Sequence, residues 1–565
     1  MTPPKVLLVS GHMIDKPDRE SPRFPPSEVP RVTRQVEAAL REWGVGPETT
    51  VICGAARGAD LIAAERAHAL GARIKLVLAR PADDHVEKSV DLPGTDWAQR
   101  FRHMLTISDV QELSGTAEDV YGAANDRMIE LGRETARRES AELLVLLIWN
   151  GRTGDGEGGT RDVVAKLGFA GPGPHVRVID PTPRAYESRQ FAEGPKRLLS
   201  LDGGGIRGVI TLEVLDRIEQ LLRRHYGNDD LVLADYFDYI AGTSTGAIIA
   251  TALALGKPIR EVKLDYQRLG RQVFKKRLLP MQGRSLYRDK PLRTQIEAFI
   301  GGNLTLGDPS LRSLLLIVMQ NTKTDSPWPL SNCTEAKYNR ADRNLLSVPD
   351  RNLDIGLAPL VRASTAAPVY FAPEEIVVGR HRFLFQDGGI TPFNNPALLQ
   401  FTMATLPAYG LSWPTGATNM LVVSVGTGSS PAAHPDLKRR QVNLPFNARN
   451  LPAVFMNGAA LGQDLLCRSL GTCRFGPELD REVGTLVGSS GVAGSPLFTY
   501  VRYDADLSDE KLRDAGITDR KAQKQVRKLD AVDRLKELQH LGRRAATDVD
   551  LEEHFADFLG PLHQS

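Results

Sequence analysis

The sequence is poor in cysteine and has almost no net charge. Its four cysteines, at positions 53, 333, 467 and 473, show neither the spacing of a metal site nor a disulfide framework. The net charge of +2 at pH 7 gives no general attraction for nucleic acid. We therefore expect a protein of the reducing cytosol with no bound metal and no nucleic-acid partner.

A long apolar run is also missing. Residues 1–5 read Met-Thr-Pro-Pro-Lys and contain no signal-peptide core. The longest uncharged stretch, residues 239–256, includes glycines, a serine and threonines, so it predicts a buried strand and helix rather than a membrane span. The sequence thus predicts a cytoplasmic protein with neither a signal peptide nor a transmembrane helix.

The 565 residues are long enough for more than one domain. In residues 1–180, strand-like and helix-like segments alternate, a pattern that predicts a parallel sheet with crossover helices. A proline-containing stretch then breaks the alternation, and we assign residues 181–195 to a linker. We expect two α/β domains, each a mainly parallel sheet flanked by helices. The second covers residues 196–505, and a helical extension, residues 506–565, packs on it.

Three short motifs of the second domain carry the chemistry. Residues 242–246 read Gly-Thr-Ser-Thr-Gly between a strand-like and a helix-like segment, the setting of a nucleophile elbow with Ser244 exposed on the turn. Residues 202–208 read Asp-Gly-Gly-Gly-Ile-Arg-Gly and open a helix, so the amides of Gly203, Gly204 and Gly205 are the expected oxyanion hole. Arg207 would support that loop or meet a substrate phosphate. Asp387, in Asp-Gly-Gly after a further strand, is the expected base.

With these motifs in this order, residues 195–505 resemble the patatin-like phospholipases. The segments Ala-Ser-Thr-Ala-Ala-Pro at 363–368 and Asn-Asn-Pro at 394–396 agree with that family. The resemblance implies a lipid acyl hydrolase of the phospholipase A type, in which Ser244 and Asp387 form a catalytic dyad. It also implies a membrane phospholipid substrate, peripheral contact with the inner face of the membrane, and no cofactor for catalysis.

Other readings of the hydrolase remain open. A histidine could serve as base, although His225, His381 and His434 lie in polar segments with nothing to mark one of them. The enzyme could be a transacylase, a general lipid esterase with a merely structural N-terminal domain, or an interaction module with a silent hydrolase.

Small and polar residues follow the predicted strands of the first domain, where parallel sheets bind ligands. Their pattern resembles the SLOG superfamily of Rossmann-like domains, which implies a nucleotide activator and a role in bacterial antiviral defence. Whether activation also forms a homo-oligomer is left open by the sequence. A glycosidase activity is disfavoured because the catalytic glutamate of such relatives is absent. The alternative is that these glycines only permit tight turns. The candidate nucleotide-binding residues are Ser10, Gly11, His12, Gly54, Arg57, Gly58, Asp60, Gly158, Gly159 and Thr160.

Two further segments have an open interpretation. Residues 257–293 are rich in lysine and arginine, including Lys275, Lys276 and Arg277, and could face anionic headgroups or form a solvated helix face. In the C-terminal extension, apolar residues recur at helical spacing and predict a helix that packs on the hydrolase or on another copy of the chain. These residues are Val526, Leu529, Val532, Leu535 and Leu538.

Overall fold

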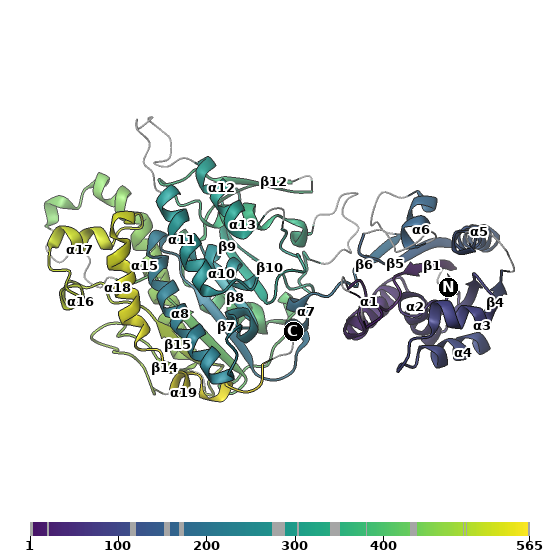
Figure 1. Cartoon of the computed structure of the whole chain (residues 1–565). Coiled ribbons are helices and arrows are strands. Elements are labelled where there is room, and N and C mark those ends of the chain that lie inside the picture. The colour runs from purple at the N-terminus through teal and green to yellow at the C-terminus, as the bar shows by residue number, and fades with distance from the viewer. Residues whose placement is uncertain are drawn as a thin grey trace. The chain divides into compact units, whose positions relative to one another are not determined.

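The computed structural model describes the chain except residues 1–3, 18, 20–21, 114–119, 152–158, 169–174, 274–288, 302–303, 340–350, 380, 430–437, 490, 493 and 563–565. The described chain forms two compact units, with the boundary between Pro183 and Arg184 (Figure 1).

The first unit contains a six-stranded, entirely parallel sheet in the order β4-β3-β2-β1-β5-β6. Its central strands are apolar and buried, as expected for a parallel sheet that helices cover on both faces. This confirms the predicted fold class for the N-terminal part. The strands are β1 (Lys5–Gly11), β2 (Thr49–Cys53), β3 (Arg73–Leu78), β4 (Asp109–Glu112), β5 (Glu142–Ile148) and β6 (Val176–Ile179).

The strand order brings the candidate nucleotide residues to one edge of this sheet. Strand β1 lies between β2 and β5. The chain places β2, β3 and β4 on one side of β1, and then β5 and β6 on the other side. The carboxyl ends of β1, β2 and β5 therefore share an edge, the position at which open parallel sheets bind ligands. The helices of the unit are α1 (Val29–Glu42), α2 (Ala59–Ala69), α3 (Ala82–His85), α4 (Trp97–Ile107), α5 (Val120–Glu139) and α6 (Thr160–Leu167).

The segment that we assigned to a linker contains a helix, α7 (Ala185–Phe191). Its Tyr186 is fully buried and donates a hydrogen bond to the carbonyl of Gly307 at 3.1 Å. The guanidinium of Arg189 donates to the carbonyls of Ala234 and Asp235. The residues of α7 thus belong to the core of the second unit.

The second unit is built on a mixed nine-stranded sheet. Eight strands run in the order β11-β12-β9-β8-β7-β13-β15-β14, and β10 pairs with β9. The strands from β9 to β14 are parallel, whereas β10, β11 and β12 are antiparallel to their neighbours. The strands are β7 (Lys196–Leu201), β8 (Tyr239–Thr243), β9 (Leu314–Asn321), β10 (Ser326–Ser331), β11 (Glu374–Val378), β12 (His381–Asp387), β13 (Met420–Val425), β14 (Thr472–Phe475) and β15 (Thr499–Tyr503).

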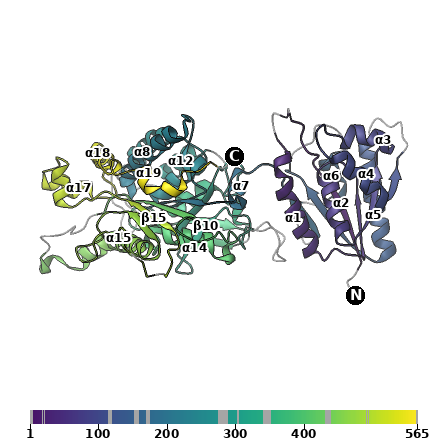
Figure 2. The same ribbon diagram turned by 90° about the horizontal axis from the view of Figure 1, so that it is seen from below.

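Helices cover both faces of this sheet, with α8 and α12 on one side of β15 and α14 and α15 on the other (Figure 2). None of the helices that the structure describes combines the length and the apolarity needed to cross a bilayer. The helices are α8 (Gly208–Tyr226), α9 (Leu233–Tyr236), α10 (Thr245–Ala254), α11 (Ile259–Val273), α12 (Asp289–Ile300), α13 (Leu357–Ser364), α14 (Ala397–Thr405), α15 (Leu444–Leu470), α16 (Asp509–Asp514), α17 (Arg520–Val526), α18 (Leu535–Ala546) and α19 (Leu551–His554).

The C-terminal extension packs on the rest of the second unit, but its apolar repeat does not form one helix. Helix α17 ends at Val526 and α18 begins at Leu535. Between them, the carbonyl of Leu529 accepts a hydrogen bond from the backbone N–H of Ile206 at 2.8 Å. A helix through Leu529 would use that carbonyl internally, so the contact with the glycine loop coincides with the break.

Candidate active site

Ser244 lies on a sharp turn between β8 and α10. Its backbone has φ of 55° and ψ of −122°, a strained conformation for a residue with a side chain. Strand β8 begins at Tyr239, because Tyr236 still belongs to the short helix α9. The carboxylate of Asp235 accepts the N–H of Val232 at the start of that helix. The strand–turn–helix arrangement predicted around Ser244 is present.

The two glycines that flank this turn have steric reasons to be there. A Cβ atom on Gly242 would clash with the carbonyl of Gly246, and one on Gly246 would clash with the carbonyl of Leu201. The close approach of the backbones leaves no room for a side chain at either position. The N–H of Ser244 donates to Ser364 Oγ at 2.9 Å, and Ser364 Oγ donates to the carbonyl of Val318 at 2.6 Å. The turn is therefore held by the neighbouring strand and helix.

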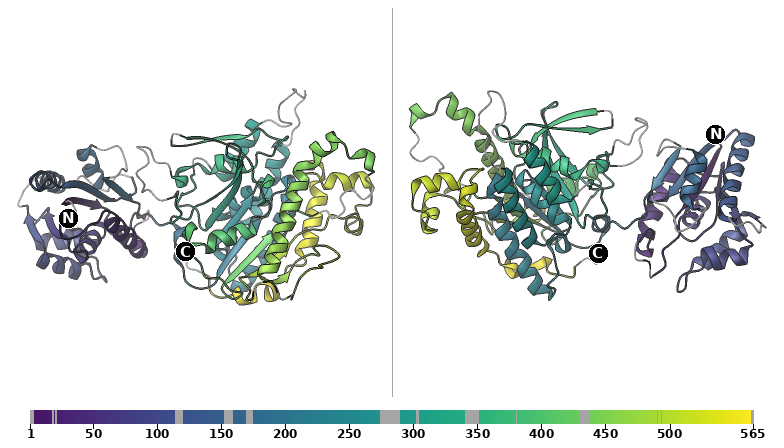
Figure 3. Two further views of the ribbon diagram at one scale, coloured as in Figure 1. Left: turned by 180° about the vertical axis from the view of Figure 1, so that it is seen from behind. Right: turned by 45° about the horizontal axis from the view of Figure 1, so that its top comes forward.

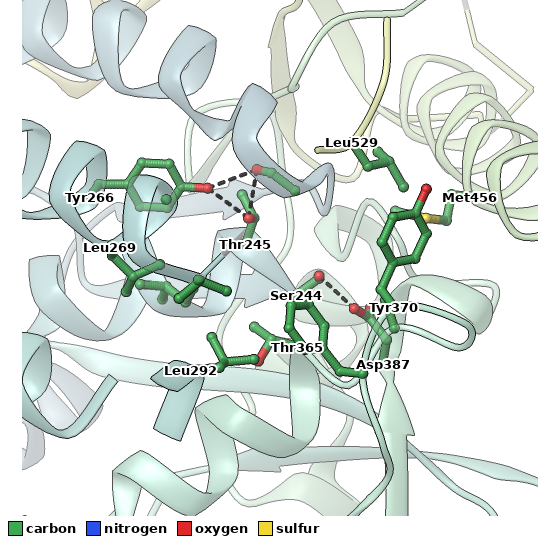
Figure 4. Close-up of a pocket in the computed structure, with 16 residues that line it drawn as sticks. Ser244, Thr245, Tyr266, Leu269, Leu292, Thr365, Tyr370, Asp387, Met456 and Leu529 are labelled. Atoms are coloured by element: carbon green, nitrogen blue, oxygen red, sulfur yellow. Dashed lines mark hydrogen bonds between the residues drawn. The ribbon is translucent and has the colours of Figure 1, made fainter. Parts of the chain in front are cut away.

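The structure brings Ser244 and Asp387 together although they are far apart in the sequence. Ser244 Oγ donates to Asp387 Oδ2 at 2.7 Å, and the N–H of Gly389 donates to Asp387 Oδ1 at 2.7 Å (Figure 4). Burial raises the pKa of Asp387 to about 7, against the opposing effects of these two hydrogen bonds and of the charge on Arg362. A carboxylate with this pKa can take a proton from a hydroxyl near neutral pH.

The glycine loop adjoins the serine. A Cβ atom on Gly203 would lie 3.2 Å from Ser244 Cβ. The N–H of Gly203 donates to the carbonyl of Asn394 at 3.1 Å, so it is already engaged. Among the residues that the structure describes, the N–H groups of Gly204 and Gly205 have no hydrogen-bond acceptor. These two amides are the ones able to bind an oxyanion at Ser244.

Two hydroxyl groups fix the far side of the loop. Thr245 Oγ1 and the Tyr266 hydroxyl both donate to the carbonyl of Gly205, at 2.8 and 2.7 Å (Figure 4). Both side chains are buried, and burial raises the pKa of Tyr266 above its ordinary value, so its hydroxyl stays protonated. Because the peptide carbonyl of Gly205 is held, the rotation of the loop beside Ser244 is restricted. The sequence motifs gave no indication of Tyr266.

A buried ion pair anchors the start of the glycine loop. Arg502 on β15 donates to both carboxylate oxygens of Asp202, at 2.8 and 2.7 Å, and it also contacts Asp504 at 3.1 Å. Next to it, Arg207 is buried and its Nη1 donates to the carbonyl of Gly428 at 3.2 Å. Of the two roles expected for Arg207, the contact in the structure is the support of the loop.

Replacing Arg502 with methionine should lower the free energy of unfolding by about 3–5 kcal/mol, because two buried carboxylates lose their partner. The matched control is Arg382→Met, since Arg382 pairs with Glu375 on the surface with 67% of its side chain exposed, against 3% for Arg502. The control should lose less than about 1 kcal/mol. Urea denaturation measures both variants, and equal losses would show that the buried pair does not anchor the loop.

An apolar pocket, part of it open to solvent, lies over Ser244. Helices α10 and α11 and the segment after α13 form much of its wall, and Met456 from α15 and Leu529 from the C-terminal extension close one side (Figure 4). Such a lining suits a fatty-acyl chain. The lining side chains that carry no polar group are Ile248, Leu269, Val273, Leu292, Ala367, Phe371, Met456 and Leu529.

The candidate nucleotide residues of the first unit gather at the edge of its sheet. Ser10 Oγ lies 3.5 Å from Thr160 Oγ1, just after Gly159, and His12 Nε2 lies 2.9 Å from Asn150 Oδ1. Burial lowers the pKa of His12 and raises that of Asp60 to about 7.

Steric contacts explain the small residues in part. A Cβ atom on Gly11 would clash with Ala59 of α2, and one on Gly58 would lie 2.8 Å from the backbone nitrogen of Ile14. A Cβ atom on Gly54 would lie 3.1 Å from Asp60 Oδ2. Arg57 Nε donates to the carbonyl of Ile14 at 3.2 Å. Close packing thus explains in part why glycine stands at these positions, and nucleotide binding remains a prediction.

Some sequence predictions fall outside the described residues. These are Gly158 of the nucleotide set, Lys275, Lys276 and Arg277 of the basic segment, and His434 among the alternative bases. The two other histidines lie within the described residues. His225 lies at the end of α8, with Nδ1 3.6 Å from a carboxylate oxygen of Glu552, and His381 is an exposed residue at the start of β12.

Comparisons with known proteins identify the central part of the chain. Residues 199–399 match the family described as patatin-like phospholipase, which confirms the resemblance drawn from the motifs. A cGAMP-activated phospholipase of Escherichia coli is 34% identical over 208 residues, which cover 36% of this chain and 54% of the relative. A cGAMP-activated phospholipase of Vibrio cholerae is 32% identical over 230 residues, covering 39% of this chain and 59% of the relative.

A third relative is matched over a smaller share of its own length. An intracellular phospholipase A2 of Caenorhabditis elegans is 31% identical over 289 residues, covering 49% of this chain and 24% of the relative. The chain thus spans somewhat more than half the length of the two bacterial relatives, 54% and 59%. Residues 199–399 form a patatin-like phospholipase domain.

Proposed function

We propose that this chain is a lipid acyl hydrolase of the phospholipase A type, with Ser244 as nucleophile and Asp387 as base. The observation that carries the proposal is the 2.7 Å hydrogen bond from Ser244 Oγ to Asp387 Oδ2 at an apolar pocket. Three relatives that are named phospholipases support the reaction class.

The reaction begins when Ser244 Oγ attacks the acyl carbonyl and Asp387 accepts the hydroxyl proton. The carbonyl oxygen becomes an oxyanion, and the amides of Gly204 and Gly205 donate hydrogen bonds to it. The intermediate then expels the alcohol, which takes the proton from Asp387, and an acyl-serine remains. A water molecule attacks this ester with Asp387 again as base, and the fatty acid and free Ser244 result.

The rate should depend on pH through Asp387. The base acts only when ionised, and its pKa of about 7 means that protonation removes it as the pH falls below neutrality. We expect kcat/KM to fall about ten-fold for each pH unit below about 7 and to level above it. Fatty-acid release from an ester that has no ionisable group measures the profile. A rate that stays constant down to about pH 5 would contradict the assignment of the base.

Product analysis with phospholipid vesicles tests the proposed reaction. Mass spectrometry should show free fatty acid and lysophospholipid with the wild-type chain and neither with Ser244→Ala. A transacylase would instead transfer the acyl group to an added alcohol and yield a new ester, which the same spectra would reveal. Intact phospholipid after incubation with the wild-type chain, under all conditions of the next experiment, would overturn the proposal.

We also propose that a nucleotide bound at the edge of the first unit's sheet switches on the hydrolase. Two relatives are named as cGAMP-activated, and the polar residues at the ends of β1, β2 and α6 offer donors and acceptors for such a ligand. An activator must bind the active state more tightly than the resting state, and coupling of this kind commonly amounts to about 5–150-fold.

A panel of cyclic and linear nucleotides tests this regulation in the full chain. At least one should raise the rate of ester hydrolysis by a factor in that range, and the same compound should bind the Ser244→Ala chain. The rate should also be followed against protein concentration, because an activity that appears only on assembly would indicate an interaction module with a silent hydrolase. If no nucleotide binds or changes the rate, the gating proposal fails while the hydrolase proposal stands.

A further inference from the structure

One face of helix α15 is exposed and apolar. Apolar residues that are 40–62% exposed recur at helical spacing on this helix, and we call them the α15 apolar face. The only charged residue between positions 451 and 466 is Asp464, which is buried and paired with the buried Arg468 at 2.7 Å. The face is therefore without charge. Its members are Leu451, Val454, Phe455, Leu461, Leu465 and Leu466.

The other side of the same helix reaches the catalytic pocket. Met456 is buried and lines the pocket together with Ser244 and Asp387. A Cβ atom on Gly389, in the turn that follows Asp387, would lie 3.1 Å from the terminal methyl carbon of Met456. Helix α15 thus contributes Met456 to the pocket wall from its buried side, and it runs along the unit as a long light-green helix (Figure 3, left).

Basic residues directly precede this helix. Lys438, Arg439 and Arg440 are exposed, and the last two form a short turn before α15 begins. An apolar helix face flanked by cations matches an anionic bilayer surface, where acyl chains lie beneath negatively charged headgroups. A second protein chain would explain the apolar face but would have no need of the adjacent positive charge.

We propose that the α15 apolar face docks the chain on the surface of an anionic membrane. The helix lies in the plane of the interface, with its leucines and Phe455 among the acyl chains and Arg439 and Arg440 at the headgroups. This docking rests on the proposed hydrolysis of membrane lipids, because it places the wall of the pocket that contains Met456 next to the bilayer.

Vesicle binding of the Ser244→Ala chain tests the proposal without hydrolysis of the vesicles. Val454→Glu combined with Leu461→Glu places two charges on the face, at positions with 62% and 50% exposure. The matched control combines Val377→Glu with Leu406→Glu, at 52% and 48% exposure on β11 and after α14. In co-sedimentation with vesicles of equal parts phosphatidylglycerol and phosphatidylethanolamine, the first pair should weaken binding at least about ten-fold. The control should bind as the parent does.

The same substitutions in the chain with Ser244 separate docking from catalysis. Hydrolysis of the vesicles should fall with binding, whereas hydrolysis of a short-chain ester dissolved in water should persist. If the wild-type chain hydrolyses no ester, the proposed function fails. Co-sedimentation of the Ser244→Ala chain still tests whether the α15 apolar face binds vesicles. Binding equal to that of the control would overturn the docking proposal. So would a change from oligomer to monomer at unchanged binding, which would assign the face to contacts between copies.

Discussion

Replacing Ser244 with alanine, or Asp387 with asparagine, is expected to lower kcat/KM for ester hydrolysis at least about 1000-fold. Alanine removes the attacking oxygen. Asparagine keeps the size of the side chain and can still accept a hydrogen bond from Ser244 Oγ, but it cannot take up the proton. The 2.7 Å contact between these side chains makes the two losses interdependent. The double variant should therefore have about the same kcat/KM as the less active of the two single variants.

Histidine variants are the matched controls for this experiment. Alanine at His225, His381 or His434 should leave the rate within about two-fold, because a dyad needs no imidazole. In the structure, His225 lies beside Glu552 and His381 lies beside Phe383, rather than beside Ser244. A loss of activity in any of the three histidine variants, with the fold intact, would replace the dyad by a triad.

A methyl group on Gly205 should lower kcat about 100–1000-fold, with a much smaller effect on KM. Gly205 has a φ of +58°, and a Cβ atom there would clash with the carbonyl of Leu529. The loop must shift away from that carbonyl, and the amides of Gly204 and Gly205 then lose their alignment with Ser244. Because these amides act on the oxyanion, the transition state loses more than the bound substrate.

Gly227→Ala is the matched control for Gly205→Ala. Gly227 has nearly the same φ, +61°, at the end of α8, and a Cβ atom there would meet nothing within 4 Å. Both substitutions place a side chain at a similar positive φ, so the control should cost about 1 kcal/mol of stability and leave the rate unchanged. Steady-state kinetics and thermal melting of both variants decide the matter. Equal rates in the two variants would show that the position of the glycine loop does not limit catalysis.

The catalytic motifs could be predicted from the sequence because their signals are local. The turn at Ser244 needs small residues immediately beside it, and the glycine loop needs flexible backbone at a helix start, so both leave a mark in a few adjacent letters. The pairing of Ser244 with Asp387 was inferred from a family resemblance, and no pattern of periodicity contains it. The parallel sheet of the first unit was predictable for a different reason, since buried parallel strands are apolar throughout.

The walls of the pocket could not be predicted. Leu529 contacts the glycine loop through its backbone carbonyl, and a backbone group has no residue-specific signal in the sequence. Its apolar spacing with Val526 and Val532 instead indicated one continuous helix, which the structure breaks at that position. Likewise, Tyr266 is one of many aromatic residues on amphipathic helices, and only the fold places its hydroxyl at the carbonyl of Gly205.

The same long-range packing gives the C-terminal extension and α15 a place at the site. Leu529 and Met456 both lie beyond residues 199–399, the part of the chain that matches the family. In the proposed mechanism, the motifs within the matched region supply the reacting groups, whereas segments outside it complete one wall of the pocket. Differences in substrate preference between this chain and its relatives are expected to arise from that wall.

Covalent labelling with a fluorophosphonate tests the central claim most directly, because such a probe reacts with an activated serine and loses fluoride in the process. Mass spectrometry of the digested full chain should find one adduct, on the peptide that contains Ser244. The adduct should be absent from Ser244→Ala and should form at least about 100-fold more slowly in Asp387→Asn. An unlabelled Ser244 in a chain that hydrolyses phospholipids, or an adduct on another residue that tracks the activity, would contradict the assignment of Ser244 as the nucleophile.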